Sequence, residues 1–216
     1  MSKALPFFRR MIWIGGTHWQ VDSVEDQDAL LCAAETSAQF PFGLILWESA
    51  VALSQDLYAR APNLAGKTIL ELGAGLGLSG VVAASLGATV TQTDHDATAL
   101  RACAHTAAIN VISGITRTLG DWHAWQDATQ YDFVLGADIA YDADDHNALF
   151  AVFKQCVKPD GLVLLADPRR QNQTAFLGHA AIEGWAVSST VCNSPDLRSV
   201  NAALTVPIDV FQLRRC

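Results

Sequence analysis

The sequence lacks the residue patterns by which chains commonly hold a metal ion or cross a membrane. Its five cysteines are scattered without a Cys-x-x-Cys pair, and its six histidines form no His-x-x-x-His pair. We therefore expect no metal site and no disulfide framework, and reduced thiols favour a cytoplasmic location. No apolar run is long enough to span a bilayer, and the first ten residues are not followed by the apolar stretch of a signal peptide.

Basic residues are also scarce. The 14 Lys and Arg residues stand against 22 Asp and Glu, which gives a net charge of −8, and no basic cluster is larger than a pair. Proteins that bind nucleic acid through its phosphates usually present a basic face. We therefore expect neither a nucleic-acid nor a membrane partner, whereas an acidic surface suits a basic or lysine-bearing substrate.

The chain does contain a large apolar fraction. Half of the 216 residues are apolar and 17% are charged, which is enough for one full-sized core. We predict a main domain over residues 41–216 and an N-terminal extension over residues 1–40 that packs on it. Strand-like segments flank Gly15-Gly16, so this extension is expected to contain a β-hairpin. We expect a monomer.

From residue 66 onward, apolar strand-like segments alternate with helix-like ones. The predicted strands are 67–72, 88–93, 115–119, 131–137 and 161–166. The predicted helices of this region are 76–86, 97–110, 145–157 and 172–183, and one further helix, 44–57, precedes it. Such alternation favours a parallel sheet covered on both faces. Two further strand-like segments, 185–191 and 206–214, have no helix between them and predict an antiparallel hairpin at one edge.

A glycine-rich segment, ILELGAGLGLSG, includes the end of the first strand of this series. Alternate glycines after a strand let the backbone turn sharply and let a nucleotide-like ligand come close. Glu71, Gly73, Gly75 and Gly77 fit a loop that binds S-adenosylmethionine, and Gly80 is then a helix position that packs on the sheet. The spacing Gly75-x-Gly77-x-x-Gly80 also fits the dinucleotide fingerprint.

Acidic and aromatic residues follow the next two strands. Asp94 lies about 20 residues after the glycines, where a carboxylate can accept hydrogen bonds from ribose hydroxyls. Asp96 is then free to cap the next helix. Asp121 and Trp122 follow the third strand and suit the amino edge and the face of an adenine, although Trp125 competes for the second role.

The fourth strand end separates the two kinds of cofactor. A dehydrogenase usually needs a hydride-handling group such as a Tyr-x-x-x-Lys pair, and no lysine of this chain stands at that spacing from a tyrosine. Methyl transfer needs a nucleophile held in line with an already activated methyl group, with charge arranged around it. The carboxylate of Asp138 and the phenol of Tyr141 are suited to that task.

Asp138-x-x-Tyr141 resembles the Asp-x-x-Tyr element of the seven-β-strand protein lysine methyltransferases. The run FGLILWE at 42–48 is similar to that family's segment ahead of the glycine loop, and GAD at 136–138 is similar to its fourth strand end. The run ADPRR at 166–170 is similar to the Asp-Pro-x-Arg stretch of the branch that modifies electron transfer flavoprotein. The resemblance extends from about residue 40 to residue 166, and these motifs are specific to the family but not to one substrate.

The resemblance implies a Rossmann-like class I methyltransferase fold, with a seven-stranded, mostly parallel sheet and a C-terminal antiparallel hairpin. It implies S-adenosylmethionine as cofactor, S-adenosylhomocysteine as product and a protein lysine as acceptor, which Asp138 and Tyr141 would bind. Together with the residues chosen above from the loop and strand ends, the expected cofactor-binding set is Trp47, Glu71, Gly73, Ala74, Gly75, Gly77, Asp94, Asp121, Trp122 and Ala137.

Three other functions remain open on the sequence. The chain fits a methyltransferase of a small amine or metabolite, a non-catalytic nucleotide- or NAD-binding protein, and an interaction protein whose acidic surface docks a basic partner. The fourth strand end lacks the prolines of the Asn/Asp-Pro-Pro-Tyr element found in enzymes that methylate base nitrogens. This absence lowers the expectation of a nucleic-acid base as acceptor.

Overall fold

A seven-stranded sheet forms the centre of the computed structural model, which describes residues 5–25, 42–197 and 204–216. The strand order is β5-β4-β3-β6-β7-β9-β8, and the first five strands of this order run parallel. Both β9 pairings are antiparallel, so the predicted fold class is confirmed. The strands are β3 (Thr68–Leu72), β4 (Thr89–Asp94), β5 (Thr116–Leu119), β6 (Tyr131–Ala137), β7 (Val157–Asp167), β8 (Trp185–Pro195) and β9 (Thr205–Arg215).

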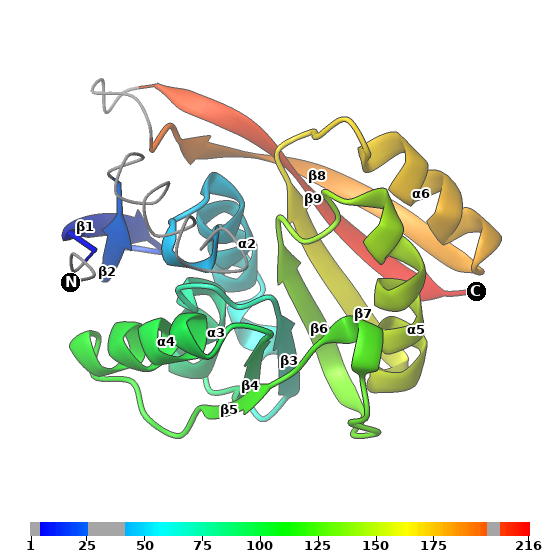
Figure 1. Ribbon diagram of the computed structural model, residues 1–216, viewed down its shortest axis with the longest axis horizontal. Coiled ribbons are helices and arrows are strands. Elements are labelled where there is room, and N and C mark those ends of the chain that lie inside the picture. Colours follow the sequence, from blue (N-terminus) through cyan, green and yellow to red (C-terminus); the bar gives the residue numbers. More distant parts are fainter. Residues whose placement is uncertain (1–4, 26–41, 198–203) are drawn as a thin grey trace.

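Helices cover both faces of this sheet (Figure 1). One face carries α2 (Glu48–Ala59), α3 (Leu78–Ser85) and α4 (Ala97–Ile109), and the other carries α5 (His146–Cys156) and α6 (Gln173–Ile182). Alternate strand residues face opposite sides, so Leu70 and Val134 pack with the α5 side whereas Ile69 and Leu135 pack with the α2 side. Short 3-10 turns are η1 (Phe42–Leu44), η2 (Ala61–Asn63), η3 (Trp122–Ala124) and η4 (Ala143–Asp145).

The prediction of a helix over 44–57 is wrong at its start. Trp47 is the extended N-cap residue, with φ −94° and ψ 144°, and α2 begins at Glu48. The preceding residues Leu44 and Leu46 are buried outside any α-helix. A carboxylate in the first turn is favourable at the positive end of the helix dipole, which agrees with a start at Glu48.

Two segments that fall between predicted elements belong to strands in the structure. Tyr131 pairs with Val157 but Phe133 pairs with Leu162, so the run KPDG at 158–161 forms a bulge within β7 rather than a turn before it. The run NSP at 193–195 belongs to β8 and pairs with β9, where a loop was predicted. Proline is compatible with this position because β8 is the edge strand of the sheet and Pro195 is its last residue.

The predicted N-terminal hairpin is confirmed. Strands β1 (Phe7–Ile14) and β2 (Thr17–Val24) pair antiparallel around Gly15 and Gly16, whose φ angles are 59° and 81°. Two successive residues with positive φ match the right-handed twist of a two-residue hairpin, and glycine adopts them without steric cost.

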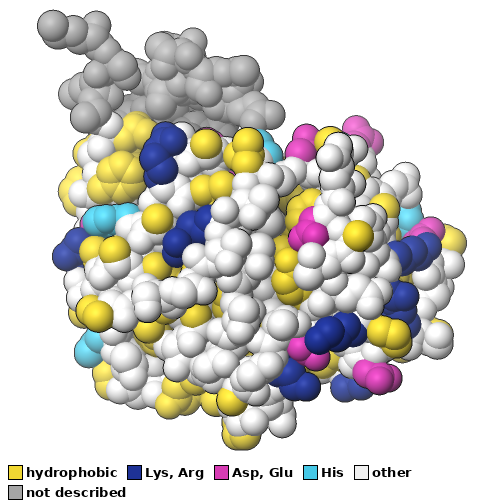
Figure 2. Space-filling view, turned by 90° about the horizontal axis from the view of Figure 1, so that it is seen from below, with side chains coloured by type: hydrophobic (Ala, Val, Ile, Leu, Met, Phe, Trp, Pro, Cys, Tyr) yellow, Lys and Arg dark blue, Asp and Glu magenta, His cyan; other side chains and the backbone are white. Residues whose placement is uncertain are grey.

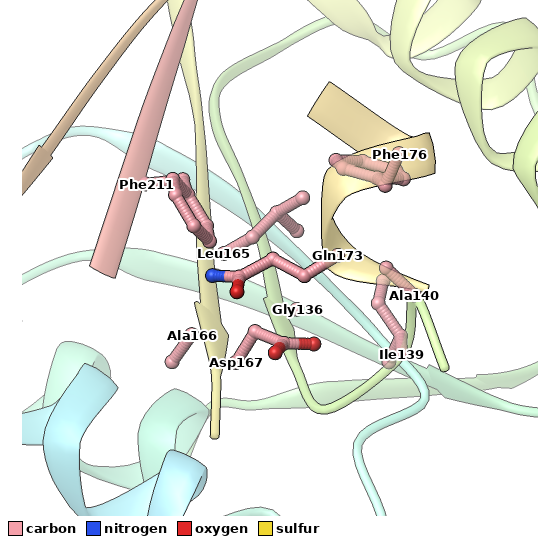
Figure 3. Close-up of a pocket in the computed structure, with 9 residues that line it drawn as sticks. All are labelled: Gly136, Ile139, Ala140, Leu165, Ala166, Asp167, Gln173, Phe176 and Phe211. Atoms are coloured by element: carbon pink, nitrogen blue, oxygen red, sulfur yellow. The ribbon is translucent and has the colours of Figure 1, made fainter. Parts of the chain in front are cut away.

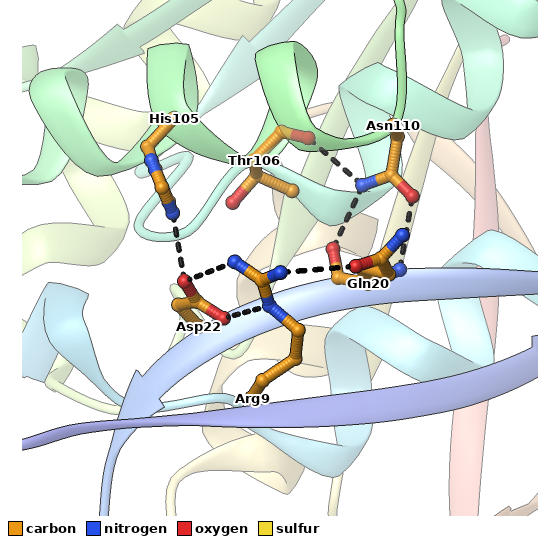
Figure 4. A network of polar contacts seen from close by, with 6 residues as sticks. All are labelled: Arg9, Gln20, Asp22, His105, Thr106 and Asn110. Carbon is orange, nitrogen blue, oxygen red and sulfur yellow. Dashed lines mark hydrogen bonds and ion pairs between the residues drawn. The ribbon is translucent and has the colours of Figure 1, made fainter.

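Polar contacts join this hairpin to α4 (Figure 4). The Gln20 N–H donates to Asn110 Oδ1 over 2.9 Å, and Asn110 Nδ2 donates to the Gln20 carbonyl over 2.7 Å. Asp22 lies within 2.7 Å of Arg9 Nε and 2.8 Å of His105 Nε2. The hydrogen bond from Arg9 lowers the pKa of Asp22 to about 2. These contacts hold the hairpin in one register against α4.

The order in which strands are added to the sheet reverses between β3 and β6, which are themselves parallel. From β3 the strands proceed one way to β4 and β5, and from β6 they proceed the other way to β7. Ligands of open α/β sheets bind outside the carboxyl ends of the strands at such a switch point. Leu72 pairs with Gly136, so the glycine loop and the Asp138 segment begin side by side at this edge.

The amino ends of the strands carry paired charges. Lys67 and Lys158 both approach Asp132, over 3.8 Å and 2.9 Å. On the face seen in Figure 2, the basic side chains at the lower right lie among acidic ones, and those on the left stand apart from one another among apolar and uncharged atoms. Along residues 5–25, 42–197 and 204–216, no helix combines the length and apolar character needed to cross a bilayer.

Candidate active site

Three left-handed glycines form the loop between β3 and α3. Gly73, Gly75 and Gly77 have φ angles of 56°, 54° and 76°, which L side chains rarely adopt. A Cβ on Gly75 would lie 3.3 Å from the Gly43 carbonyl oxygen, and one on Gly73 would lie 2.9 Å from Ile139. The loop therefore packs closely on its neighbours at the switch point, and its first part, from Gly73 to Gly75, stays partly exposed.

Glu71 lies behind this loop rather than on its surface. Its side chain is buried, and Oε2 accepts hydrogen bonds from the Gly80 N–H over 3.1 Å and from Gln92 Nε2 over 2.8 Å. Gln92 Nε2 also donates to the Gly77 carbonyl over 3.0 Å. Gly80 is the close-packing helix position that was predicted, whereas the Glu71 side chain supports the loop and does not line the ligand surface.

Burial raises the pKa of Glu71 to about 7, although its bonds to Gln92 and Gly80 oppose the rise. The folded pKa therefore exceeds the unfolded value, so the stability contribution is present below the unfolded pKa and is lost as pH rises toward 7. Glu71→Gln removes this titration. We expect the variant to gain about 3 kcal/mol in unfolding free energy relative to wild type between pH 4.5 and pH 8, measured by urea denaturation at each pH. A constant difference across this range would contradict the assignment.

Asp94 ends β4 beside the glycine loop. Its Oδ2 accepts from the Gly75 N–H over 3.0 Å, and its Oδ1 accepts from the Asp96 N–H over 2.9 Å. Burial raises the pKa of Asp94. Asp96 caps α4 by accepting from the Thr98 N–H over 2.6 Å, as predicted. Each carboxylate oxygen of Asp94 keeps a second lone pair, so acceptor capacity for a ligand hydroxyl remains.

Trp122, and not Trp125, lies beside the glycine loop. A Cβ on Gly73 would lie 3.5 Å from the Trp122 ring. The Trp125 indole N–H instead donates to the Asp127 carbonyl over 2.8 Å and lies 3.1 Å from Cys156 Sγ at the end of α5. Asp121 caps η3 through the His123 N–H over 2.9 Å.

The remaining predicted cofactor residues lie at the same edge of the sheet. The Ala74 N–H donates to the Thr93 carbonyl over 2.9 Å. Ala137 is the last residue of β6 and pairs with β7. The Trp47 indole N–H donates to the Phe42 carbonyl over 3.2 Å. The structure thus brings these residues near the end of β3, while their contacts with a ligand stay a prediction.

Asp138 has an unusual backbone and a charged partner. Its φ angle is 57°, and its N–H donates to the Ala166 carbonyl at the end of β7 over 2.8 Å. The side chain is 5% exposed and forms a two-point ion pair with Arg170, in which Nε lies 2.5 Å from Oδ1 and Nη2 meets Oδ2. Arg170 therefore occupies part of the carboxylate that the sequence assigned to an acceptor amine.

Tyr141 stands at the rim of the site. It is 43% exposed, and its ring centre lies 6.5 Å from that of Phe42. Burial of its hydroxyl, followed by the nearby carboxylate of Asp145, raises the pKa of Tyr141. Asn172 Nδ2 donates to the Tyr141 carbonyl over 2.7 Å, which ties this loop to the start of α6.

His146 holds the same loop from α5. It is buried, and its Nε2 lies 3.0 Å from the Ala140 carbonyl oxygen. A carbonyl only accepts, so this nitrogen carries the proton. His146 and Asn172 together bind two successive carbonyls of the Asp-x-x-Tyr segment and so restrict its conformation.

A small cavity lies behind the strand ends (Figure 3). Its volume is about 10 Å³, roughly the space of one water molecule, and Asp167 and Gln173 are its polar lining side chains. Among the described residues, Asp167 Oδ2 has no hydrogen-bond partner, and burial raises the pKa of this carboxyl group. In the same part of the chain, no three His, Cys, Asp or Glu side chains gather as a metal-ion site.

The sequence analysis assigned no role to four supporting residues. Gln92, His146 and Asn172 are ordinary polar residues on helices, strands or loops, and nothing local marks their partners. Arg170 did carry a signal, because it is the arginine of the run ADPRR at 166–170, which is similar to an Asp-Pro-x-Arg stretch. Arg169 instead pairs with Asp209 over 3.0 Å.

The overall fold is that of the class I methyltransferases. MtfA, a glycopeptide N-methyltransferase solved with S-adenosylmethionine, superposes with a TM-score of 0.60 at 15% identity, over 78% of this chain and 94% of MtfA. The ribosomal protein L11 methylase of Lactobacillus delbrueckii subsp. bulgaricus superposes with a TM-score of 0.60 at 18% identity, over 78% of this chain and 79% of that chain.

Residues 25–181 match the model of the lysine methyltransferase family, and the chain belongs to that family. It is 31% identical over 141 residues to the protein N-lysine methyltransferase METTL21A of Xenopus tropicalis, and 36% identical over 129 residues to that of Danio rerio. These matches cover 61% and 56% of this chain, and they span 63% and 59% of the relatives' length. The histone-arginine methyltransferase METTL23 of Xenopus laevis is 27% identical, over 79% of this chain and 69% of its own.

Proposed function

We propose that this protein transfers a methyl group from S-adenosylmethionine to the side-chain amine of a protein lysine. The observation that carries the proposal is the juxtaposition at the switch point, where Leu72 pairs with Gly136. This pairing sets the glycine loop after β3 beside Asp138 and Tyr141 after β6. Family membership and the likeness to METTL21A support a protein lysine as acceptor.

The residues present fit the cofactor. The glycine loop from Gly73 to Gly77 would let the cofactor approach the backbone closely. The first turn of α3 offers N–H groups to a carboxylate of the cofactor. Asp94 would receive the ribose hydroxyls, and Asp121 with Trp122 would hold the adenine. Trp47, Ala74 and Ala137 would complete the cofactor site. When bound, S-adenosylmethionine supplies an electrophilic methyl group on a sulfonium.

The acceptor must reach this methyl group as a neutral amine. A free lysine has a pKa near 10.4, so its deprotonation at pH 7 costs about 4.6 kcal/mol. Burial of the amine near a positive charge lowers that cost. Asp138 draws in the ammonium and orients its nitrogen, and the proton leaves to water. With S-adenosylmethionine bound, its sulfonium would supply the methyl group to this nitrogen and be left as S-adenosylhomocysteine, and Tyr141 would shape the entrance.

Two binding and labelling experiments test this function. Calorimetry should detect binding of S-adenosylhomocysteine to the protein and no binding of NADH. Binding of NADH alone would contradict the proposal. Incubation with S-adenosylmethionine labelled in its methyl group and a whole-cell extract should label a protein band. The label should be recovered as methyl-lysine after hydrolysis. Recovery as methyl-arginine would instead support the chemistry named for METTL23, and label in small molecules alone would support a metabolite methyltransferase.

A further inference from the structure

Arg170 is held on three sides at the acceptor end of the site. Its guanidinium makes the two-point contact with Asp138, and its central carbon lies 5.5 Å from the centre of the Trp47 ring. Its backbone N–H donates to Asp167 Oδ1 over 2.9 Å. The Arg170 side chain is 36% exposed and that of Asp138 only 5%. Asp138 is thus the buried member of the pair, and Arg170 covers it from the partly exposed side.

The surroundings of this pair are acidic. Asp138 is the largest cause of a raised pKa of Arg170, and Asp167 and Glu48 contribute further. His123 Nε2 lies 2.6 Å from Asp145 Oδ1. We call the space beside Asp138 and Tyr141 the acceptor seat. The titratable groups around it come from β4, α2, β7 and the segment after β6, namely Asp94, Glu48, Asp167, Tyr141, Asp142 and Asp145.

We propose that Arg170 is a positioning residue for the methyl transfer: it stays on Asp138 while the acceptor binds, fixes that carboxylate and balances its charge. The inference rests on the proposed function. The acceptor amine then meets an ion pair of nearly zero net charge rather than an isolated carboxylate.

The geometry favours a retained Arg170 over one displaced by the incoming lysine. An ammonium is a point charge and does not reproduce the planar two-point contact or the stacking on Trp47. Displacement would also move the Arg170 guanidinium away from the nearby carboxylates of Asp167 and Glu48. An ionised carboxylate has about four lone-pair sites, and Arg170 uses two of them on Asp138. An amine therefore has room to bind Asp138 beside Arg170.

Charge balance matters because only the neutral amine reacts. An isolated carboxylate would raise the pKa of the acceptor ammonium and keep it protonated, whereas a neighbouring cation lowers that pKa. A two-point contact from a guanidinium also limits the carboxylate to one orientation. Arg170 thus resolves the conflict between attracting a lysine and deprotonating it.

The first test measures charge without needing an acceptor. In-line transfer requires the sulfonium to lie close to the acceptor seat, so cationic S-adenosylmethionine senses this charge and neutral S-adenosylhomocysteine does not. By calorimetry, Arg170→Gln should raise the affinity ratio of S-adenosylmethionine to S-adenosylhomocysteine about fivefold, and Asp138→Asn should lower it about fivefold. Arg170→Lys and the neighbouring control Arg169→Gln should stay within about twofold of wild type. An unchanged ratio in both Arg170→Gln and Asp138→Asn would overturn the proposal.

The second test uses the pH dependence of extract labelling. Arg170→Gln should shift the rising limb of the rate to higher pH by about one unit, so that the variant reaches near pH 8.5 the rate that wild type has at pH 7.5. Arg170→Lys keeps the charge and should return the limb to its wild-type pH, at a lower maximal rate because an ammonium lacks the two-point contact. An equal loss at every pH, or faster labelling at neutral pH, would overturn the proposal. Thermal unfolding verifies that each variant folds, and if Arg170→Gln does not, Asp138→Asn and Arg170→Lys still decide the sign of the charge effect. If wild type labels nothing, the proposed function fails, while the binding ratios still decide the role of Arg170.

Discussion

Asp138→Asn is expected to lower methyl transfer about 100-fold or more, while the affinity for S-adenosylhomocysteine changes less than about twofold. Asparagine has the same size and tolerates the left-handed φ of 57° at this position, so the loop conformation is retained. The variant loses the charge that attracts and orients the acceptor, and losses of 10²–10⁴ are common when a group that acts on the reacting atoms is removed. Extract labelling and calorimetry on the same preparation measure the two quantities.

Asp142→Asn is the matched control for this variant. Asp142 is exposed and follows Tyr141 directly, and it caps η4 by accepting from the Asp144 N–H over 3.0 Å. Asparagine caps nearly as well as aspartate, so only a charge at the rim is lost. The control should keep its rate within about threefold. Wild-type activity in Asp138→Asn, or an equal loss in Asp142→Asn, would sink the assignment of Asp138 to the acceptor amine.

Gly80→Ala is expected to lower the unfolding free energy by roughly 2–4 kcal/mol. A Cβ at this position would lie 2.3 Å from Glu71 Oε2 and 2.6 Å from Gln92 Nε2. Both atoms are the ends of side chains, yet they have nowhere to move because Glu71 and Gln92 are buried and bonded to each other and to the backbone of the loop. Relief of the overlap breaks this network, so chemical denaturation and the affinity for S-adenosylhomocysteine should both show the loss.

Gly178→Ala should have the opposite sign. Gly178 also lies inside a helix, α6, but a Cβ there would have no atom within 4 Å. Alanine is favoured over glycine in a helix interior by about 0.5–1 kcal/mol, so this variant should be stabilised by about that amount. Similar destabilisation of both variants would show that helix propensity, and not the contact with Glu71 and Gln92, governs position 80.

Much of the fold follows from patterns within short segments. The alternation of apolar strands with helical segments predicted the sheet, and β6 begins and ends where it was expected, at Tyr131 and Ala137. Gly15-Gly16 predicted the hairpin because the twist of paired strands demands positive φ at both turn residues. Where local signals conflicted with pairing, pairing prevailed, as at Pro159, which lies in a bulge of β7.

The candidate site was likewise predictable from the sequence only in part. The positions after the strand ends were readable because parallel strands deliver their carboxyl ends to one edge, and this brings Gly73, Asp94 and Asp138 together. The direction of each side chain was not readable. Glu71 stands one residue before the last of β3, and only packing against α3 turns its carboxylate toward Gly80 and away from the ligand surface.

The sequence by itself determined the order of strands and helices, the glycine loop and the acidic residues after the strands, because each depends on neighbours within a few positions. Only the tertiary structure decided which of these side chains meet. Asp138 and Arg170 are 32 residues apart and come together because β6 and β7 end side by side. The electrostatic potential that an acceptor meets is therefore set by both members of this pair. That potential depends on distances between atoms, which the order of residues does not contain.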